Sequence, residues 1–396
     1  MKACKALTAS TGLIFKSTHL SKFLFGLTSL LLLSNFVSAG TYYSNSANPT
    51  TTNNWWTNTN GTGSHPSNFT TSGDIFILQA GQTCATANDW TIGSGVTLQV
   101  DGTLSINGNN DDVIINGTIY FTNTGAAQVT MAGGGSGNSL TINGTVKTAN
   151  ANGLQGTNCS IPANAAKKTT TLSSSGTYEF NCGAVQAISG LPTTVTNLKV
   201  NNGNCLNITG SINVSGTLTL SSGILNIAPG NTINITSGNA ISGSGFSATK
   251  HINTQVNTST GAQGFIRVGN ISSAYTIPCG NGTYYLPVTL TPSATNDFSV
   301  NVFQGATSNG TPNGTAFSNA KKLRMVDAIW VVNRNSGAGN VSMTLSWPAA
   351  LEGSTFSTFG NSSIGISHYG GSWDMYTGSG DQAPNTATRT GISSFS

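Results

Sequence analysis

The chain has 396 residues, of which 37% are hydrophobic, only 7% are charged and 49 are glycine. An ordinary soluble domain is about 25% charged, and the charged side chains that usually cover helices are scarce here, so the composition excludes a helix-rich protein. The hydrophobic content and low net charge also exclude a wholly disordered chain. At ~150 residues per domain, the length predicts two or three domains.

Residues 1–39 have the features of a secretory signal peptide. They contain four lysines and no acidic residue, an apolar run over residues 23–33, and the small-residue cleavage sequence Val37-Ser38-Ala39. The alternative is an N-terminal membrane anchor, but the apolar run is shorter than the ~20 residues that span a bilayer. We therefore expect a secreted or cell-surface protein with no membrane span after cleavage.

Removal of this segment changes the charge balance. The whole chain has 15 Lys and Arg against 11 Asp and Glu, and four of the basic residues lie before residue 40, so eleven remain against eleven. A formally neutral chain has no basic patch of the kind that nucleic acids require. Nucleic acids are therefore excluded as partners.

Between residues 96 and 235, aliphatic side chains alternate with polar ones in short runs that end near Gly, Asn, Asp or Ser. This period of two predicts strands that are half buried against a core. A small polar residue, Gly, Thr and an aliphatic residue recur in this order at Asp101–Leu104, Asn116–Ile119, Asn143–Val146 and Ser215–Leu218. Hairpins or a stacked β-sandwich are the alternative, but short strands with a recurring turn favour a solenoid. We predict a right-handed parallel β-helix over residues 40–245.

Four aromatic residues lie near the start of this region: Tyr42, Tyr43, Trp55 and Trp56. In one interpretation they form a cap that covers the open end of the solenoid, which would otherwise expose its core and unpaired strand edges. In the other they form an exposed platform on which sugar rings stack. We favour the cap and keep the platform as the alternative.

After residue 40 there are five cysteines, of which Cys159, Cys182 and Cys205 follow one another at equal steps of 23 residues. If one coil of the solenoid has this length, the three side chains lie on successive coils. Neighbouring strands are ~4.8 Å apart, which is within the Cα separation of a disulfide. The hypothesis is one bond, either Cys182–Cys205 or Cys159–Cys182, and the alternative is a coincidence of spacing.

Residues 246–396 have a different composition, with more aromatic residues and prolines. Longer strands are predicted around residues 298–302, 329–332 and 341–345, and they indicate an antiparallel β-sandwich-like domain. No closing element is evident before Ser396. We expect this domain to be truncated at its C-terminus.

Several segments resemble parts of large secreted adhesin-like surface proteins of Bacteroidota-type bacteria. They are Thr41–Ser44, Asn54–Trp56, Gly73–Ile77, Gly176–Phe180, Ile188–Pro192 and, in the last third, Val341–Trp347 and Gly371–Trp373. Residues 73–106 are also similar to G8 domains, which are glycine-rich β modules. The resemblance implies an extracellular adhesive role, often with a C-terminal sorting domain, and no such domain is evident in this sequence.

The sequence gives little support to catalysis. Glycoside hydrolases need two carboxylates at one bond, and β-helix polysaccharide lyases need a base with charge stabilisation, but the acidic and basic residues are not grouped along the chain. No histidine has a second metal ligand at a typical spacing. We predict no catalytic, cofactor or metal residues and no cofactor. The expected function is a non-enzymatic adhesive protein that contacts glycans, proteins or neighbouring cells through an uncharged Ser/Thr/Asn-rich surface. The alternatives are a β-helix polysaccharide lyase or hydrolase and a dedicated glycan-binding module.

Overall fold

A computed structural model describes residues 39–122, 128–131, 137–236, 238, 241–376, 378 and 380–395. The predicted signal peptide lies outside the described residues, apart from Ala39. Residues Gly40–Ser396 form one compact unit, and the structure is almost entirely β, with about 5% helix. No helix in the described part of the chain has the length and apolar character needed to cross a bilayer.

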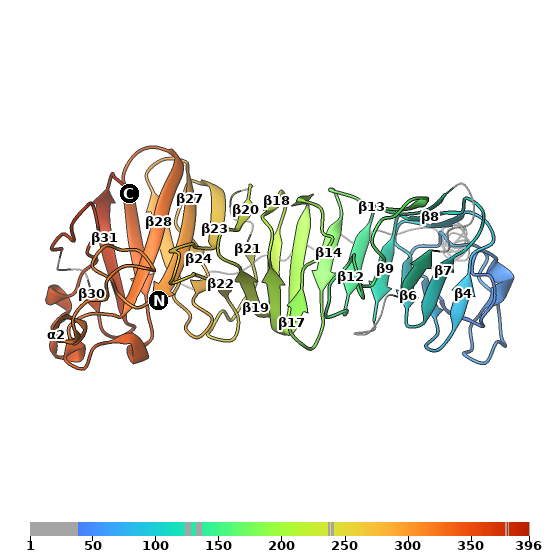
Figure 1. Ribbon diagram of the computed structural model, residues 1–396, viewed down its shortest axis with the longest axis horizontal. Helices are drawn as coiled ribbons and strands as arrows, with labels where there is room; N and C mark the ends of the chain where they lie inside the picture. The colour runs from blue at the N-terminus through green and yellow to red at the C-terminus, as the bar shows by residue number, and fades with distance from the viewer. Residues whose placement is uncertain are drawn as a thin grey trace, which may run out of the picture. The chain divides into compact units, whose positions relative to one another are not determined.

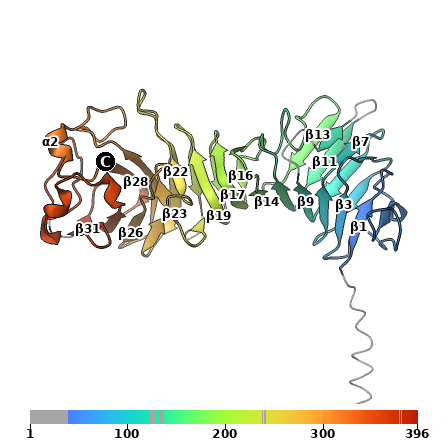
Figure 2. The ribbon, with the colours of Figure 1, turned by 90° about the horizontal axis from the view of Figure 1, so that it is seen from below.

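The predicted parallel β-solenoid is confirmed and has about eight turns. Its principal sheet, called the long sheet below, contains strands from successive turns in chain order (Figure 1, Figure 2). Its parallel strands are β1 (Thr41–Ser44), β3 (Ile75–Leu78), β6 (Thr97–Val100), β9 (Thr118–Phe121), β12 (Thr145–Thr148), β14 (Thr177–Phe180), β17 (Asn197–Ile208), β19 (Leu218–Ile227), β22 (Ile252–Thr254) and β25 (Cys279–Gly280). The short strand β2 (Trp55–Trp56) pairs with β1 in the antiparallel direction.

In the early turns the solenoid has two further sides besides the long sheet, and each of them is a smaller parallel sheet. One consists of β4 (Thr83–Ala85), β7 (Thr103–Ile106) and β10 (Val129–Met131), and the other of β5 (Trp90–Ile92), β8 (Asp112–Ile115), β11 (Asn138–Ile142) and β13 (Lys168–Leu172). In the later turns, β15 (Gln186–Ala187) and β21 (Ile241–Ser242) pair with β17 and β19. The third side there consists of β16 (Thr194–Val195), β18 (Ile212–Val214), β20 (Thr232–Ile235) and β23 (Phe265–Ile271).

The alternating pattern has the predicted orientation. In the long sheet, Leu98 of β6 pairs with Ile119 of β9, which pairs with Val146 of β12, and all three side chains are buried. The polar residues between them face outward. Fully burying one such side chain contributes about 1.5–3 kcal/mol to the free energy of folding. Each turn adds its aliphatic residues to a continuous core and thereby stabilises the turn beside it.

The recurring glycine has a steric explanation. Gly117 and Gly144 lie at the corner that leads into β9 and β12, where the backbone of one turn stacks closely on the next. A Cβ atom on Gly144 would overlap the carbonyl oxygens of Asn116 and Gly117 in the preceding turn. Only glycine permits this approach, so the corner selects the residue type.

The C-terminal part is antiparallel, as predicted for the sandwich-like domain. Strands β27 (Asn296–Gln304) and β28 (Ala328–Gly337) extend the sheet of β23. A second sheet has the order β24 (Tyr275–Ile277), β26 (Val288–Pro292), β29 (Val341–Ser346), β31 (Thr386–Ile392) and β30 (Gly380–Asp381). The three longer strands predicted from the sequence fall within β27, β28 and β29. We call β24 together with residues 281–395 the C-terminal module.

The boundary expected at residue 245 needs correction. Parallel pairing continues to Val268 in β23 and to Gly280 in β25, so the last turn of the solenoid lies beyond that residue. The loss of aliphatic residues near residue 245 has two causes. Strand β22 buries the polar side chains of Asn253 and Thr254, and the segment 255–264 is a loop with one isolated bridge rather than a strand. The strand β23 belongs to both parts, because it pairs with β20 in parallel and with β27 in antiparallel.

Candidate functional site

The four aromatic residues near residue 40 divide into an inward and an outward pair. The Trp55 side chain is 0% exposed, and its ring lies 5.1 Å from Phe76 and 6.1 Å from Trp90. Tyr42 stacks on Phe76 at 5.3 Å between ring centroids. These two residues therefore cap the core. The platform interpretation is wrong for Trp55, because a fully buried ring cannot receive a sugar.

Tyr43 and Trp56 have the opposite orientation. They are paired across β1 and β2, and both are half-buried. Since neighbouring residues of a strand face opposite sides of a sheet, they lie on the outer face of the long sheet when Tyr42 and Trp55 lie on its inner face. The Trp56 ring is 5.4 Å from the ring of His65, which lies in the following loop.

The outer face of the long sheet carries a continuous column of side chains. Each member pairs in register with the next, so the column crosses eight strands, and the whole set is called the outer column below. Its members are Trp56, Tyr43, Ile77, Gln99, Tyr120, Lys147, Glu179 and Lys199. At ~4.8 Å between neighbouring strands, the column extends over about 34 Å.

The charged end of the outer column is internally neutralised. The Glu179 carboxylate forms ion pairs with Lys147 at 3.5 Å and with Lys199 at 3.2 Å. The side-chain amide of Asn201 also donates a hydrogen bond to this carboxylate at 2.9 Å. Burial alone would raise the pKa of Glu179, but these hydrogen bonds and the two lysine charges lower it below the ordinary value. The Lys147 ammonium also lies 4.5 Å from the centroid of the Tyr120 ring.

A second column of hydroxyl groups runs beside the first. It consists of Thr97, Thr118, Thr145 and Thr177, which pair in register on successive strands. Asn197 continues it, and its amide donates to the Thr177 hydroxyl at 3.1 Å. We call this set the threonine column. Aromatic, charged and hydroxyl side chains are therefore adjacent on one face.

The proposed disulfide is wrong: Cys159, Cys182 and Cys205 are all free. The local coil has 20 residues rather than 23, because Gln186 pairs with Leu206 on the next turn. Cys205 in turn pairs with Ile224. Equal spacing along the chain therefore does not place the thiols at equivalent positions.

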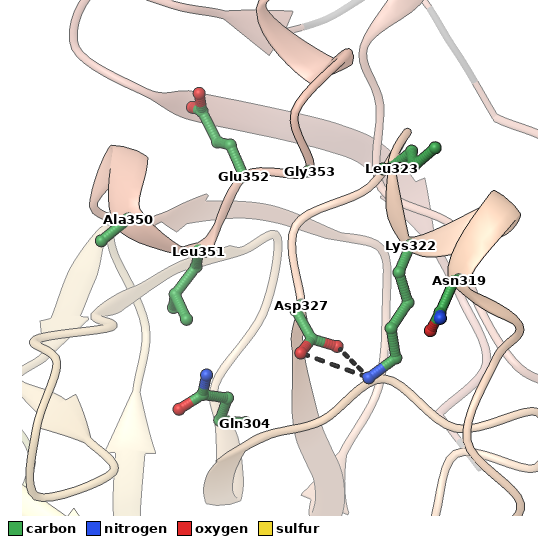
Figure 3. Close-up of a pocket in the computed structure, with 9 residues that line it drawn as sticks. All are labelled: Gln304, Asn319, Lys322, Leu323, Asp327, Ala350, Leu351, Glu352 and Gly353. Carbon is green, nitrogen blue, oxygen red and sulfur yellow. Dashed lines mark hydrogen bonds and ion pairs between the residues drawn. The ribbon is translucent and has the colours of Figure 1, made fainter.

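The C-terminal module contains a pocket of about 330 Å³ that brings together Lys322, Asp327 and Glu352 (Figure 3). Lys322 is at the end of helix α2 (Asn319–Lys322), and its ammonium is 3.0 Å from an oxygen of Asp327, which also accepts from the backbone of Ala306 at 2.8 Å. The Glu352 carboxylate points away from this pair and accepts from Trp347 at 2.9 Å. Both carboxylates thus serve local structure. Lys322 and Asp327 are five residues apart in sequence, Glu352 is more distant, and no motif connects the three.

Among the described residues, no group of three or more His, Cys, Asp or Glu side chains is arranged to hold a metal ion. His251 is buried, with its Nδ1 3.0 Å from the Ser247 carbonyl and its Nε2 accepting from the Gly282 amide at 3.3 Å. This imidazole therefore holds the last solenoid turn against the segment that enters the C-terminal module.

Comparison with protein-family models, curated proteins and solved structures found no match for this chain.

Proposed function

We propose that the protein is an exported, non-catalytic adhesive protein that binds carbohydrate on the outer face of its long sheet. The outer column carries the proposal, because it aligns Trp56, Tyr43 and Tyr120 with polar side chains on one surface. A sugar has an apolar C–H face surrounded by hydroxyl groups. Its binding surface therefore combines aromatic faces with hydrogen-bonding groups, which the two columns provide.

The charges on the outer face of the long sheet are paired, which supports binding of carbohydrate without long-range electrostatic attraction. Lys147 and Lys199 are paired with Glu179, and the neighbouring threonine column is uncharged. Paired ions still accept and donate charge-assisted hydrogen bonds to hydroxyl groups. The predicted signal peptide at residues 1–39 supports display of this surface outside the cell.

The alternative of a polysaccharide-degrading enzyme has less support. A glycosidase needs one carboxylic acid that keeps its proton and a second carboxylate across the bond. In the outer column the carboxylate is Glu179, and its lowered pKa keeps it ionised between two lysines. This arrangement suits a hydrogen-bond acceptor better than a proton donor.

The test is retention of the secreted protein on a panel of insoluble polysaccharides. We expect retention on at least one of them and a loss of at least tenfold in the Trp56→Ala variant. Tyr376→Ala is the control, because Tyr376 is a half-buried ring in the C-terminal module, 4.7 Å from the Arg389 guanidinium. Absence of retention, or equal losses in both variants, would contradict the proposal. Release of reducing or unsaturated sugar ends would favour the enzyme instead.

A further inference from the structure

We infer that the ligand of the outer column is an extended, uncharged β-1,4-linked hexose chain that lies across the strands, with about one sugar for each turn of the solenoid. The inference rests on the proposed function and adds the geometry and charge of the ligand. It is carried by the spacing of the outer column, the position of its aromatic members and its charge balance.

The distance between successive members of the outer column favours an extended sugar chain as the ligand. Successive members of the outer column are separated by one strand step, ~4.8 Å. Each sugar of a β-1,4-linked ribbon advances along the chain by nearly the same length, so neighbouring sugars meet neighbouring strands. An α-1,4-linked chain coils, and it would leave this straight surface after a few units.

The aromatic members divide the column into subsites. Trp56 and Tyr43 are adjacent, and Tyr120 lies three strand steps beyond Tyr43, with Ile77 and Gln99 between them. In an extended ribbon the first and second sugars would therefore rest on aromatic rings, and the fifth would lie at Tyr120, where the Lys147 ammonium already covers one face of the ring and can itself donate to a sugar hydroxyl. The threonine column provides hydroxyl groups along the edge of the ribbon from the fourth strand onward.

The charged side chains of the outer column and beside it favour an uncharged sugar chain as the ligand. Two lysines and Glu179 occupy the far end of the outer column, and Asp101 lies beside its middle, where it accepts from the Gln99 amide at 3.0 Å. These four groups have no net charge. A polyanion would meet both carboxylates and a polycation would meet both lysines, whereas the hydroxyl groups of a neutral sugar can pair with either.

The experiment measures affinity by titration calorimetry for neutral β-1,4-linked oligosaccharides of two to eight units and for α-1,4-linked oligosaccharides of equal length. We expect affinity for the β-linked series to rise at least tenfold from the dimer to the octamer, and the α-linked octamer to bind at least tenfold more weakly than its β-linked counterpart. Tyr120→Ala should remove the gain that appears beyond four units and leave dimer and trimer binding unchanged, whereas Tyr376→Ala should change neither.

The possible failures are distinguishable. Equal affinity for the two linkages, an affinity that does not rise with length, or tighter binding of a charged β-1,4-linked chain would overturn the inference and leave the proposed function intact. Binding of no carbohydrate in either series, together with no retention on the insoluble panel, would overturn both.

Discussion

The solenoid and the C-terminal module satisfy their polar groups in different ways. In the solenoid, neutral amides stack on successive turns: Asn226 donates to Asn207 at 2.7 Å, and Asn253 donates to Asn226 at 2.8 Å. In the C-terminal module, charged pairs anchor irregular loops, and Arg389 contacts Asp374 at 2.6 Å.

The difference follows from the direction of the strands. Parallel stacking places equivalent positions at ~4.8 Å from one another, so a charge repeated on each turn would repel its neighbours, whereas an amide both donates and accepts. Charge enters the long sheet where signs alternate, as in Lys147, Glu179 and Lys199. Repetition thus favours neutral side chains, and the low charged fraction of the sequence reflects this requirement.

The largest predicted effect concerns the two adjacent tryptophans at the capped end. Trp55→Ala removes a fully buried ring and is expected to lower the free energy of unfolding by about 3–5 kcal/mol. Trp56→Ala should lower it by less than about 1 kcal/mol, because Trp56 faces outward. Urea denaturation of both variants measures the difference. Similar losses in the two would contradict the division into inward and outward pairs.

A second prediction concerns the close stacking of corners on successive turns of the solenoid. Gly144→Ala places a methyl group against the preceding turn and is expected to lower the free energy of unfolding by about 1–3 kcal/mol. Gly210→Ala is the matched control, because a Cβ atom there meets no other atom within 4 Å. The control should differ from wild type by less than about 0.5 kcal/mol. If both substitutions are equally tolerated, the corners do not explain the recurring glycine.

The solenoid shows which features could be predicted from the sequence and which could not. The alternation over residues 96–235, together with the short strands and the recurring turn, was enough to predict the parallel solenoid. The outer column was not predicted, because the turns differ in length: Tyr120 to Lys147 is a step of 27 residues, and Glu179 to Lys199 is a step of 20. Alternation identifies the outward residues of one strand but not which residues of the next strand lie beside them.

The recurring Gly-Thr dipeptide indicates how the strands of successive turns align with one another. In Gly117-Thr118, Gly144-Thr145 and Gly176-Thr177, the threonine belongs to the threonine column, and the residue two positions later belongs to the outer column. Aligning these pairs would have brought Tyr120, Lys147 and Glu179 together. Gly102-Thr103 misleads, because Thr103 begins β7, which lies on a different side of the solenoid. The pocket at Lys322 has no comparable signal, since irregular loops bring its residues together.

A third prediction tests the junction of the two regions. His251 is 0% exposed, and burial lowers its pKa below 6.5. The neutral ring accepts from the Gly282 amide, so folding favours the unprotonated form. Its contribution is therefore fully present above the unfolded pKa of about 6.5 and is lost as the pH falls towards the folded pKa, by at most about 1.4 kcal/mol per pH unit.

Urea denaturation between pH 7.5 and pH 5 measures this slope. His251→Gln should be less stable than wild type at pH 7.5 and should lose less stability on acidification. His65→Gln is the control, because His65 lies in a loop near the opposite end of the solenoid. An unchanged pH dependence in His251→Gln would show that the junction does not sense the protonation of this ring.

The smallest expected effect is at the charged end of the outer column. The Glu179 side chain is 11% exposed, whereas that of Asp374 in the C-terminal module is 39% exposed. Because Glu179 has a lowered pKa, its stabilisation is present above the unfolded value of about 4.5 and disappears as the pH falls through the folded pKa. Glu179→Gln should therefore reduce the free energy of unfolding by about 0.5–1 kcal/mol at pH 7 and low salt, and the two proteins should converge once the pH has fallen through the folded pKa. Asp374→Asn should have a smaller effect, because water screens the more exposed pair. Added salt should reduce both differences. If Asp374→Asn proves the more damaging substitution, side-chain exposure does not rank these two ion pairs, and the charged pairs of the C-terminal module matter more than the alternating charges on the long sheet.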